Sequence, residues 1–125
     1  MTGTDQLARH RRDFGTWGED LAARHLQERG LVLLGRNWRC REGELDLVLT
    51  DRVRVVFCEV KTRSGIEFGL PSETVTEEKA GRVRRAAHRW LSEFRIGWCP
   101  VRYDVVTVLA EAGARPRLQH IEAAF

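Results

Sequence analysis

The stretch GELDLVLTDRVRVVFCEVKTR, residues 43–63, decides the fold. Apolar side chains alternate with other side chains over residues 44–50 and again over residues 53–62. Successive residues of a strand point to opposite faces of a sheet, so this alternation predicts two β-strands. The short polar break Asp51-Arg52 between them predicts an antiparallel hairpin.

The expected register of this hairpin brings two carboxylates together. With Asp51-Arg52 as the loop, Thr50 pairs with Val53, and Asp46 lies opposite Phe57 and diagonal to Glu59. Diagonal neighbours on one face are about 7 Å apart at Cβ, a separation that two carboxylates can bridge through one metal ion. A loop longer or shorter by one residue would place the two carboxylates on opposite faces.

The rest of the chain predicts an α/β domain. Apolar residues at three- and four-residue spacing indicate a first helix over residues 15–30, and a second helix that begins at a cap at Thr74 or Thr76 and ends near Phe94. Shorter apolar runs indicate further strands over residues 31–40, with an irregularity near Gly35, and over 101–109 and 118–121. The expected order is α-β-β-β-α-β, with residues 1–13 as a flexible segment and residues 14–125 as a single domain.

Composition narrows the class of protein. The 125 residues carry a net charge of +3, mostly through arginine, which favours an anionic partner. The three cysteines lie far apart and match neither a disulfide framework nor a zinc site. No apolar run approaches the roughly 18 residues that span a bilayer, and the N-terminus lacks a signal-peptide core, so we expect a cytoplasmic protein.

The carboxylates of the hairpin are the residues expected to carry chemistry. Asp46 and Glu59 are oxygen ligands of the kind that Mg²⁺ or Mn²⁺ takes, and the Val60 carbonyl is a further candidate ligand. Lys61 projects beside Glu59, because residues two apart in a strand share a face. Such a site would polarise a phosphoryl group and activate water, with Lys61 orienting that water or neutralising developing charge.

Five motifs, in order and spacing, resemble the YraN-like family of the restriction-endonuclease-like superfamily, which is similar to archaeal Holliday junction resolvases. They are Gly15-x-x-Gly18-Glu19, Asn37-Trp38-Arg39, Gly43-Glu44-Leu45-Asp46-Leu47, Phe57-Cys58-Glu59-Val60-Lys61-Thr62-Arg63 and Arg102-Tyr103-Asp104-Val105-Val106. The resemblance implies a restriction-endonuclease-like fold, with a mixed four- to five-stranded sheet flanked by helices. It also implies a metal site at Asp46, Glu59 and Lys61, which Glu19 can reach from the first helix, and suggests a homodimer.

A basic stripe on the second predicted helix is the candidate nucleic-acid surface. On a helical wheel, four basic residues gather on a side away from the apolar face: Lys79, Arg82, Arg85 and Arg89. Arginine-rich faces contact phosphates, although a solvated helix face has the same composition.

Simpler interpretations stand beside these. Glu59 and Lys61 can be an ordinary exposed charge pair, Asp46 can pair with Arg39 or Arg41, and Glu44 can be the metal ligand in its place. Glu19 alone reads as a first-turn acid of its helix.

The leading hypothesis is a metal-dependent enzyme that hydrolyses DNA phosphodiesters, with branched DNA as a candidate substrate. The alternative is a non-catalytic nucleic-acid-binding or adaptor module on the same fold.

Overall fold

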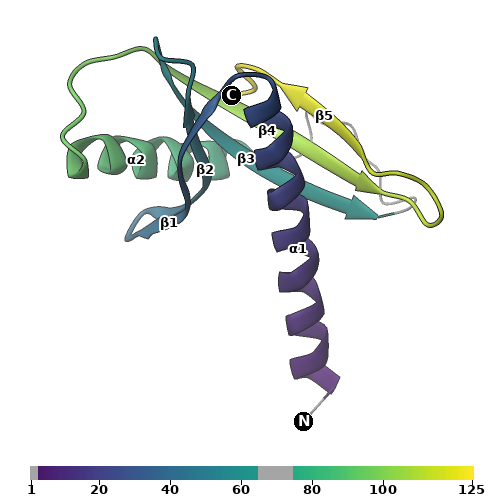
Figure 1. The fold of residues 1–125 in the computed structure, drawn as a ribbon. Coiled ribbons are helices and arrows are strands. Elements are labelled where there is room, and N and C mark those ends of the chain that lie inside the picture. The colour runs from purple at the N-terminus through teal and green to yellow at the C-terminus, as the bar shows by residue number, and fades with distance from the viewer. Residues whose placement is uncertain (1–2, 65–74) are drawn as a thin grey trace.

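A mixed five-stranded sheet with one helix on each face organises the computed structural model, which describes residues 3–64 and 75–125 (Figure 1). The elements are α1 (Gly3–Glu28), β1 (Val32–Cys40), β2 (Gly43–Thr50), β3 (Val55–Ser64), α2 (Glu77–Glu93), β4 (Val101–Ala110) and β5 (Arg117–Ile121). The strands lie in sequence order; β3 and β4 are parallel, and the other neighbours are antiparallel. This arrangement confirms the predicted fold, with β5 as the fifth strand.

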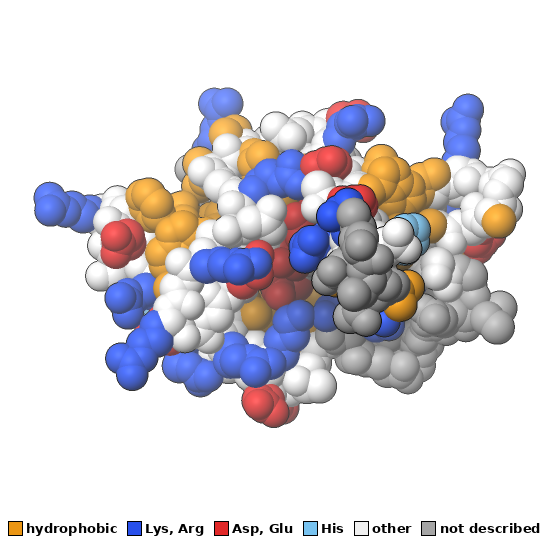
Figure 2. Space-filling model, turned by 90° about the horizontal axis from the view of Figure 1, so that it is seen from below, with side chains coloured by type: hydrophobic (Ala, Val, Ile, Leu, Met, Phe, Trp, Pro, Cys, Tyr) orange, Lys and Arg blue, Asp and Glu red, His pale blue; other side chains and the backbone are white. Residues whose placement is uncertain are grey.

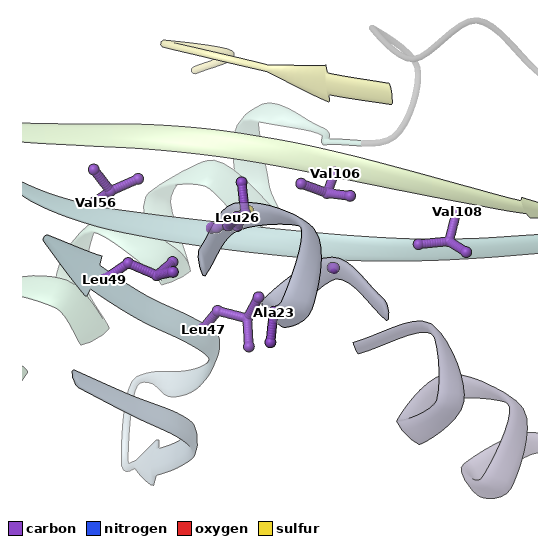
Figure 3. Close-up of a cluster of buried hydrophobic side chains, with 9 residues drawn as sticks. Ala23, Leu26, Leu47, Leu49, Val56, Val106 and Val108 are labelled. Carbon is purple, nitrogen blue, oxygen red and sulfur yellow. The ribbon is translucent and has the colours of Figure 1, made fainter. Parts of the chain in front are cut away.

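Helix α1 covers one face of the sheet through its C-terminal half. Its small and apolar side chains, including Ala23 and Leu26, pack on side chains of the central strands, such as Leu47, Val56 and Val106 (Figure 3). Gly30 ends the helix as predicted, because its φ of +98° turns the chain and lets Leu31 N–H bond to Leu26 O at 3.1 Å. Burial on this side holds α1 in place beside β3.

Helix α2 covers the opposite face and begins at the predicted cap Thr76, whose hydroxyl accepts the Lys79 amide at 3.1 Å. The competing cap Thr74 lies outside the described residues. Trp90, which is 5% exposed, packs edge-on against Phe57 of β3 with ring centroids 5.8 Å apart. The first two turns of α2 lie near the start of β2, where an added Cβ on Gly43 would be 3.8 Å from the Arg82 Cβ.

The start of α1 was predicted too late in the chain. The helix begins at Gly3 and not at Gly15, and Leu7, within the added part, is 60% exposed. Apolar periodicity detects only a buried face, whereas residues 5–12 contain no Gly or Pro and continue the helix by propensity alone. The flexibility of residues 1–13 stays a prediction.

No helix among the described residues is long and apolar enough to cross a membrane.

The β2–β3 loop is also longer than predicted. Thr50 pairs with Val55 rather than Val53, because the Asp51 carboxylate accepts the amides of Val53 and Arg54 at 2.9 and 2.7 Å and draws both residues into the turn. The loop therefore gains two residues, and the register moves by two. An even change preserves which face each side chain takes, so Asp46 and Glu59 remain on one face, now directly opposite rather than diagonal.

Candidate functional site

The candidate site lies where β2 and β3 separate. Their paired register ends at Leu47 and Cys58, and the next residues along the two strands are Asp46 and Glu59. Beyond that point side chains replace the backbone ladder: Val60 N–H donates to Asp46 Oδ2 at 2.9 Å, and Asp46 N–H donates to Glu59 Oε2 at 3.5 Å. The two carboxylates are thus fixed side by side by backbone amides.

Burial makes this carboxylate pair electrostatically unfavourable. Glu59 is only 3% exposed, and burial, together with the nearby charge of Asp46, raises its pKa to about 7. Burial also raises the pKa of Asp46, although the hydrogen bond from Val60 opposes the change. A buried acid beside a half-buried one, both with raised pKa values, indicates a site that lacks sufficient positive charge.

Two lysines supply part of that charge. Lys79 of α2 places its Nζ 3.5 Å from Glu59 Oε1. Lys61, two residues beyond Glu59 on β3, is half-buried near Lys79, and burial followed by that second ammonium lowers its pKa to about 8. Lys61 is therefore mostly protonated at neutral pH, and its proton is held less tightly than that of an ordinary lysine.

A surface hollow gives access to the pair. Its volume is about 160 Å³, room for a hydrated ion, and Glu44, Asp46, Glu59, Lys79 and Arg82 are among its lining residues. Seen from below the sheet, the surface shows acidic side chains recessed among Lys and Arg side chains (Figure 2). The arrangement suits a ligand that carries both a cation and an anion, as a metal-bound phosphate does.

Glu19 lies in a neighbouring hollow that shares Glu44 with the first. Burial raises the pKa of Glu19, a hydrogen bond with Asn37 opposes this, and the charge of Asp46 adds to it. Among the described residues, no three His, Cys, Asp or Glu side chains stand close enough to hold a metal ion together. The structure therefore brings Glu19 near Asp46 and Glu59, but not close enough to share a metal ion with them.

Arg39, one of the alternative partners of Asp46, pairs with a different acid. Arg39 Nε lies 3.4 Å from Glu44 Oε2, so the acid that Arg39 meets is Glu44. Glu44 itself is more than one third exposed at its side chain, whereas Asp46 is held by the Val60 amide. Asp46 thus remains the better placed ligand.

Gly18 allows α1 to pack closely on β3. A Cβ built on Gly18 would lie 2.0 Å from the Thr62 Oγ1 of β3, so any side chain there would force Thr62 or the helix to shift. Thr62 points to the face that α1 covers, whereas Glu59 and Lys61 point to the opposite face. Gly15, the other glycine of the same motif, has nothing within 4 Å of an added Cβ and carries no such constraint.

The four residues of the predicted basic stripe divide into two groups. Lys79 turns into the carboxylate hollow, and Arg82 lines its edge and pairs with Glu78 at 3.8 Å. Arg85 and Arg89 are exposed further along α2, with Arg89 paired to Glu42 at 3.4 Å. The stripe therefore runs from the hollow outward along the helix surface.

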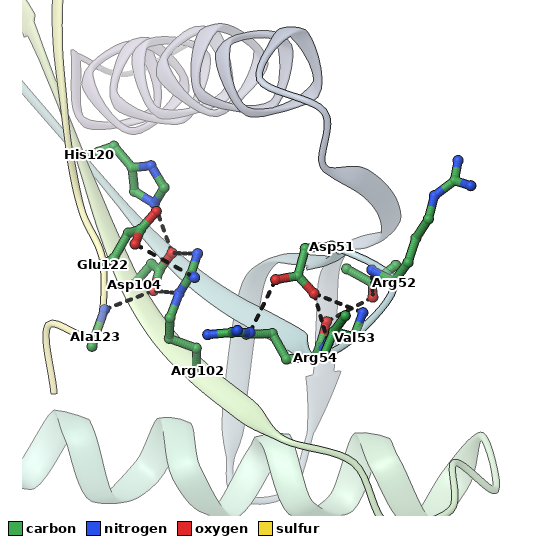
Figure 4. Close-up of polar contacts among 10 residues, drawn as sticks. Asp51, Arg52, Val53, Arg54, Arg102, Asp104, His120, Glu122 and Ala123 are labelled. Atoms are coloured by element: carbon green, nitrogen blue, oxygen red, sulfur yellow. Dashed lines mark hydrogen bonds and ion pairs between the residues drawn. The ribbon is translucent and has the colours of Figure 1, made fainter.

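A second buried carboxylate, Asp104 of β4, has the opposite electrostatic balance. Its side chain is fully buried and accepts two hydrogen bonds from Arg102 at 2.8 and 2.9 Å and one from Ala123 N–H at 3.0 Å, and His120 Nε2 lies 2.7 Å away (Figure 4). Burial opposes ionisation, but these partners lower the pKa of Asp104. We assign this cluster a structural role, which ties the C-terminal segment to β4.

The donor set fits a hard divalent cation. Mg²⁺ is usually held by one or two carboxylates, with water and phosphate oxygens completing its shell, and Asp46 and Glu59 offer such a pair. The raised pKa values of both acids show that the pair would gain from a nearby cation.

Two residues whose side chains contact acids of this site were not assigned to it from the sequence. Lys79 was placed on an outward stripe, although it precedes the buried Val83 by one helical turn and Trp90 by three, a spacing that marks the inward face. Asn37, which bonds Glu19, adopts a φ of +51°, a conformation that asparagine tolerates better than most residues; its motif was recognised in the sequence, but its contact with Glu19 was not predicted.

The mixed sheet between two helices, with paired acids and a lysine where two strands diverge, defines a restriction-endonuclease-like domain. Residues 18–108 match the model of the uncharacterised protein family UPF0102, and the chain belongs to that family.

The similar proteins carry only the family name. A UPF0102 protein of Frankia alni is 52% identical over 111 residues, covering 89% of this chain and 92% of the relative. One from Nocardia farcinica is 50% identical over 111 residues, covering 89% and 87%, and one from Acidothermus cellulolyticus is 44% identical over 135 aligned positions, covering both chains fully.

Proposed function

We propose that this protein is a metal-dependent nuclease that hydrolyses DNA phosphodiesters, with branched or flapped DNA as the first substrates to test. The buried Asp46–Glu59 pair supports the proposal most directly, because its acids are held together by backbone amides and yet lack sufficient positive charge. A pair kept in this state is expected where a cation binds during function.

Each residue of the site has a defined task in this proposal. Asp46 and Glu59 would hold Mg²⁺ or Mn²⁺, with the Val60 carbonyl as a further ligand. The bound ion would polarise the phosphate and lower the pKa of a coordinated water. Lys61, close to both acids, would orient the attacking water and neutralise charge on the phosphate oxygens. Glu19 would act from the neighbouring hollow on the water shell.

The basic stripe would bind the substrate backbone. Arg82 borders the carboxylate hollow, and Arg85 and Arg89 continue from it along the exposed side of α2. Arginine presents several donors in a planar fork that matches phosphate oxygens. A strand lying along the stripe would thereby deliver one phosphodiester to the hollow.

The decisive experiment uses a labelled panel of duplex, single-stranded, flap and four-way-junction DNA with Mg²⁺ or Mn²⁺. We expect the wild type to cut at least one substrate and both Glu59→Ala and Lys61→Ala to lose cutting. Lys61→Ala should retain most of its DNA affinity. Arg52→Ala, in the exposed turn between β2 and β3, is the control that should cut normally.

A non-catalytic nucleic-acid-binding module is the second candidate. It is favoured by the absence of a third close metal ligand among residues 3–64 and 75–125. In that case the wild type would bind DNA without cutting any member of the panel. Binding would fall in Arg85→Ala and not in Glu59→Ala, and it is the lack of cutting by the wild type that separates the two functions.

A further inference from the structure

Lys79 is held in the carboxylate hollow by its own helix. Thr76 caps its backbone amide in the first turn of α2, and its neighbour Ala80, 2% exposed, packs into the core. The Lys79 side chain is 32% exposed, whereas the Glu59 side chain that it meets is 3% exposed. The ammonium therefore enters the hollow from the solvent side and ends against a buried acid.

Both oxygens of Glu59 are engaged in this arrangement. Oε2 accepts the Asp46 amide at 3.5 Å, and Oε1 faces the Lys79 ammonium at 3.5 Å. A cation that binds Glu59 at Oε1 would be repelled by the positive charge of the Lys79 ammonium, 3.5 Å from the same oxygen. The Asp46 amide belongs to a strand of the sheet, whereas the ammonium ends a flexible and partly solvated chain, so the ammonium is the group that can move.

The basic residue next to it on the stripe does not share this position. Arg82 lines the same hollow, but the acid that it pairs with is Glu78, one turn back on α2, at 3.8 Å. Lys79 and Arg82 thus bring the same charge to the same hollow, and Lys79 makes the direct contact with Glu59. This pair of residues allows a charge-matched comparison.

We propose that Lys79 is the resident counter-ion of the Asp46–Glu59 pair and that a divalent metal ion binds by displacing its ammonium. This inference rests on the metal site of the proposed function. Lys79 would stabilise the metal-free protein and weaken metal binding, because the metal must first take the place of an existing ion pair. Once displaced, the ammonium would remain at the solvent side of the hollow, where a substrate phosphate arrives.

The test compares wild type, Lys79→Met, Lys79→Arg and Arg82→Met. Binding of Mn²⁺ is followed by the loss of the electron paramagnetic resonance signal of free Mn²⁺, with Mg²⁺ as competitor. Thermal unfolding in EDTA reports the metal-free state. We expect Lys79→Met to bind Mn²⁺ roughly five- to tenfold more tightly than Arg82→Met and to unfold at a lower temperature in EDTA. Lys79→Arg should behave as the wild type.

The outcomes separate this inference from the proposed function. If the wild type binds Mn²⁺ and Lys79→Met binds it no more tightly than Arg82→Met, displacement is wrong while the metal site stands. An EDTA melting temperature of Lys79→Met equal to that of Arg82→Met would refute the counter-ion role. If none of the four proteins binds Mn²⁺, both the proposed metal site and the displacement of Lys79 are wrong.

Discussion

Replacing Glu59 by glutamine should stabilise the metal-free protein at neutral and alkaline pH. Burial and the charge of Asp46 raise the pKa of Glu59 from 4.5 to about 7, despite the opposing charge of Lys79. A raised pKa means that the folded state holds this proton more tightly than the unfolded state does. Stability from this group is complete below pH 4.5 and is lost as the pH rises through 7.

The magnitude follows from the two pKa values. Each pH unit between 4.5 and 7 corresponds to about 1.4 kcal/mol, so ionising Glu59 in the folded protein costs about 3 kcal/mol. Most of this loss, roughly 2 to 3 kcal/mol, falls between pH 5 and pH 8. Glutamine keeps the shape of the side chain without its charge, and so removes the repulsion between Glu59 and Asp46.

Urea unfolding of the wild type and Glu59→Gln at pH 5, 6, 7 and 8, in EDTA, measures the difference directly. The advantage of Glu59→Gln should be small at pH 5 and grow by roughly 2 to 3 kcal/mol by pH 8. Glu93→Gln, at an exposed position of α2, is the control and should show no such trend. A difference between Glu59→Gln and wild type that stays constant from pH 5 to pH 8 would refute the argument.

Three further predictions test the fold and the binding surface. Gly18→Ala should destabilise the protein by about 1 to 3 kcal/mol because the new methyl meets Thr62, whereas Gly15→Ala should stabilise it by up to about 1 kcal/mol; equal effects in urea unfolding would contradict this. Asp104→Asn should cost roughly 3 kcal/mol by leaving the Arg102 guanidinium without its buried carboxylate partner, and a melting temperature like that of the wild type would argue against it. Arg85→Ala should reduce the slope of log Kd for DNA against log salt by about one; an unchanged slope would remove this residue from the interface.

The sheet and the pairing of its carboxylates were predictable because strand parity is robust. Alternation over residues 44–50 and 53–62 sets which side chains share a face, and an even error in loop length leaves that assignment intact. The loop length itself depends on one side chain, since Asp51 binds two amides of the turn. A pattern of apolar residues contains no information on such a contact.

The start of α1 and the position of Lys79 were missed for a shared reason. Apolar periodicity reports burial, so it does not detect a helix that continues into solvent beyond Gly15 or a charged residue that turns inward. Lys79 lies at the edge of the buried face of α2, where a long side chain can reach Glu59 while its backbone position still reads as polar. The contact of Lys79 with Glu59 becomes visible only when α2 and β3 are placed together in the fold.

The contrast between two buried carboxylates of the sheet, Asp104 and Glu59, supports our proposal that the Asp46–Glu59 pair is the functional one. Asp104 is buried from solvent, as Glu59 is, yet its partners His120, Arg102 and Ala123 lower its pKa. Glu59 has one ammonium and one long amide contact, and its pKa is raised to about 7. The same sheet thus fully compensates one buried acid and leaves the other unfavourable. A cation bound in the open hollow during function, as we propose, would offset the cost of ionising Glu59 there.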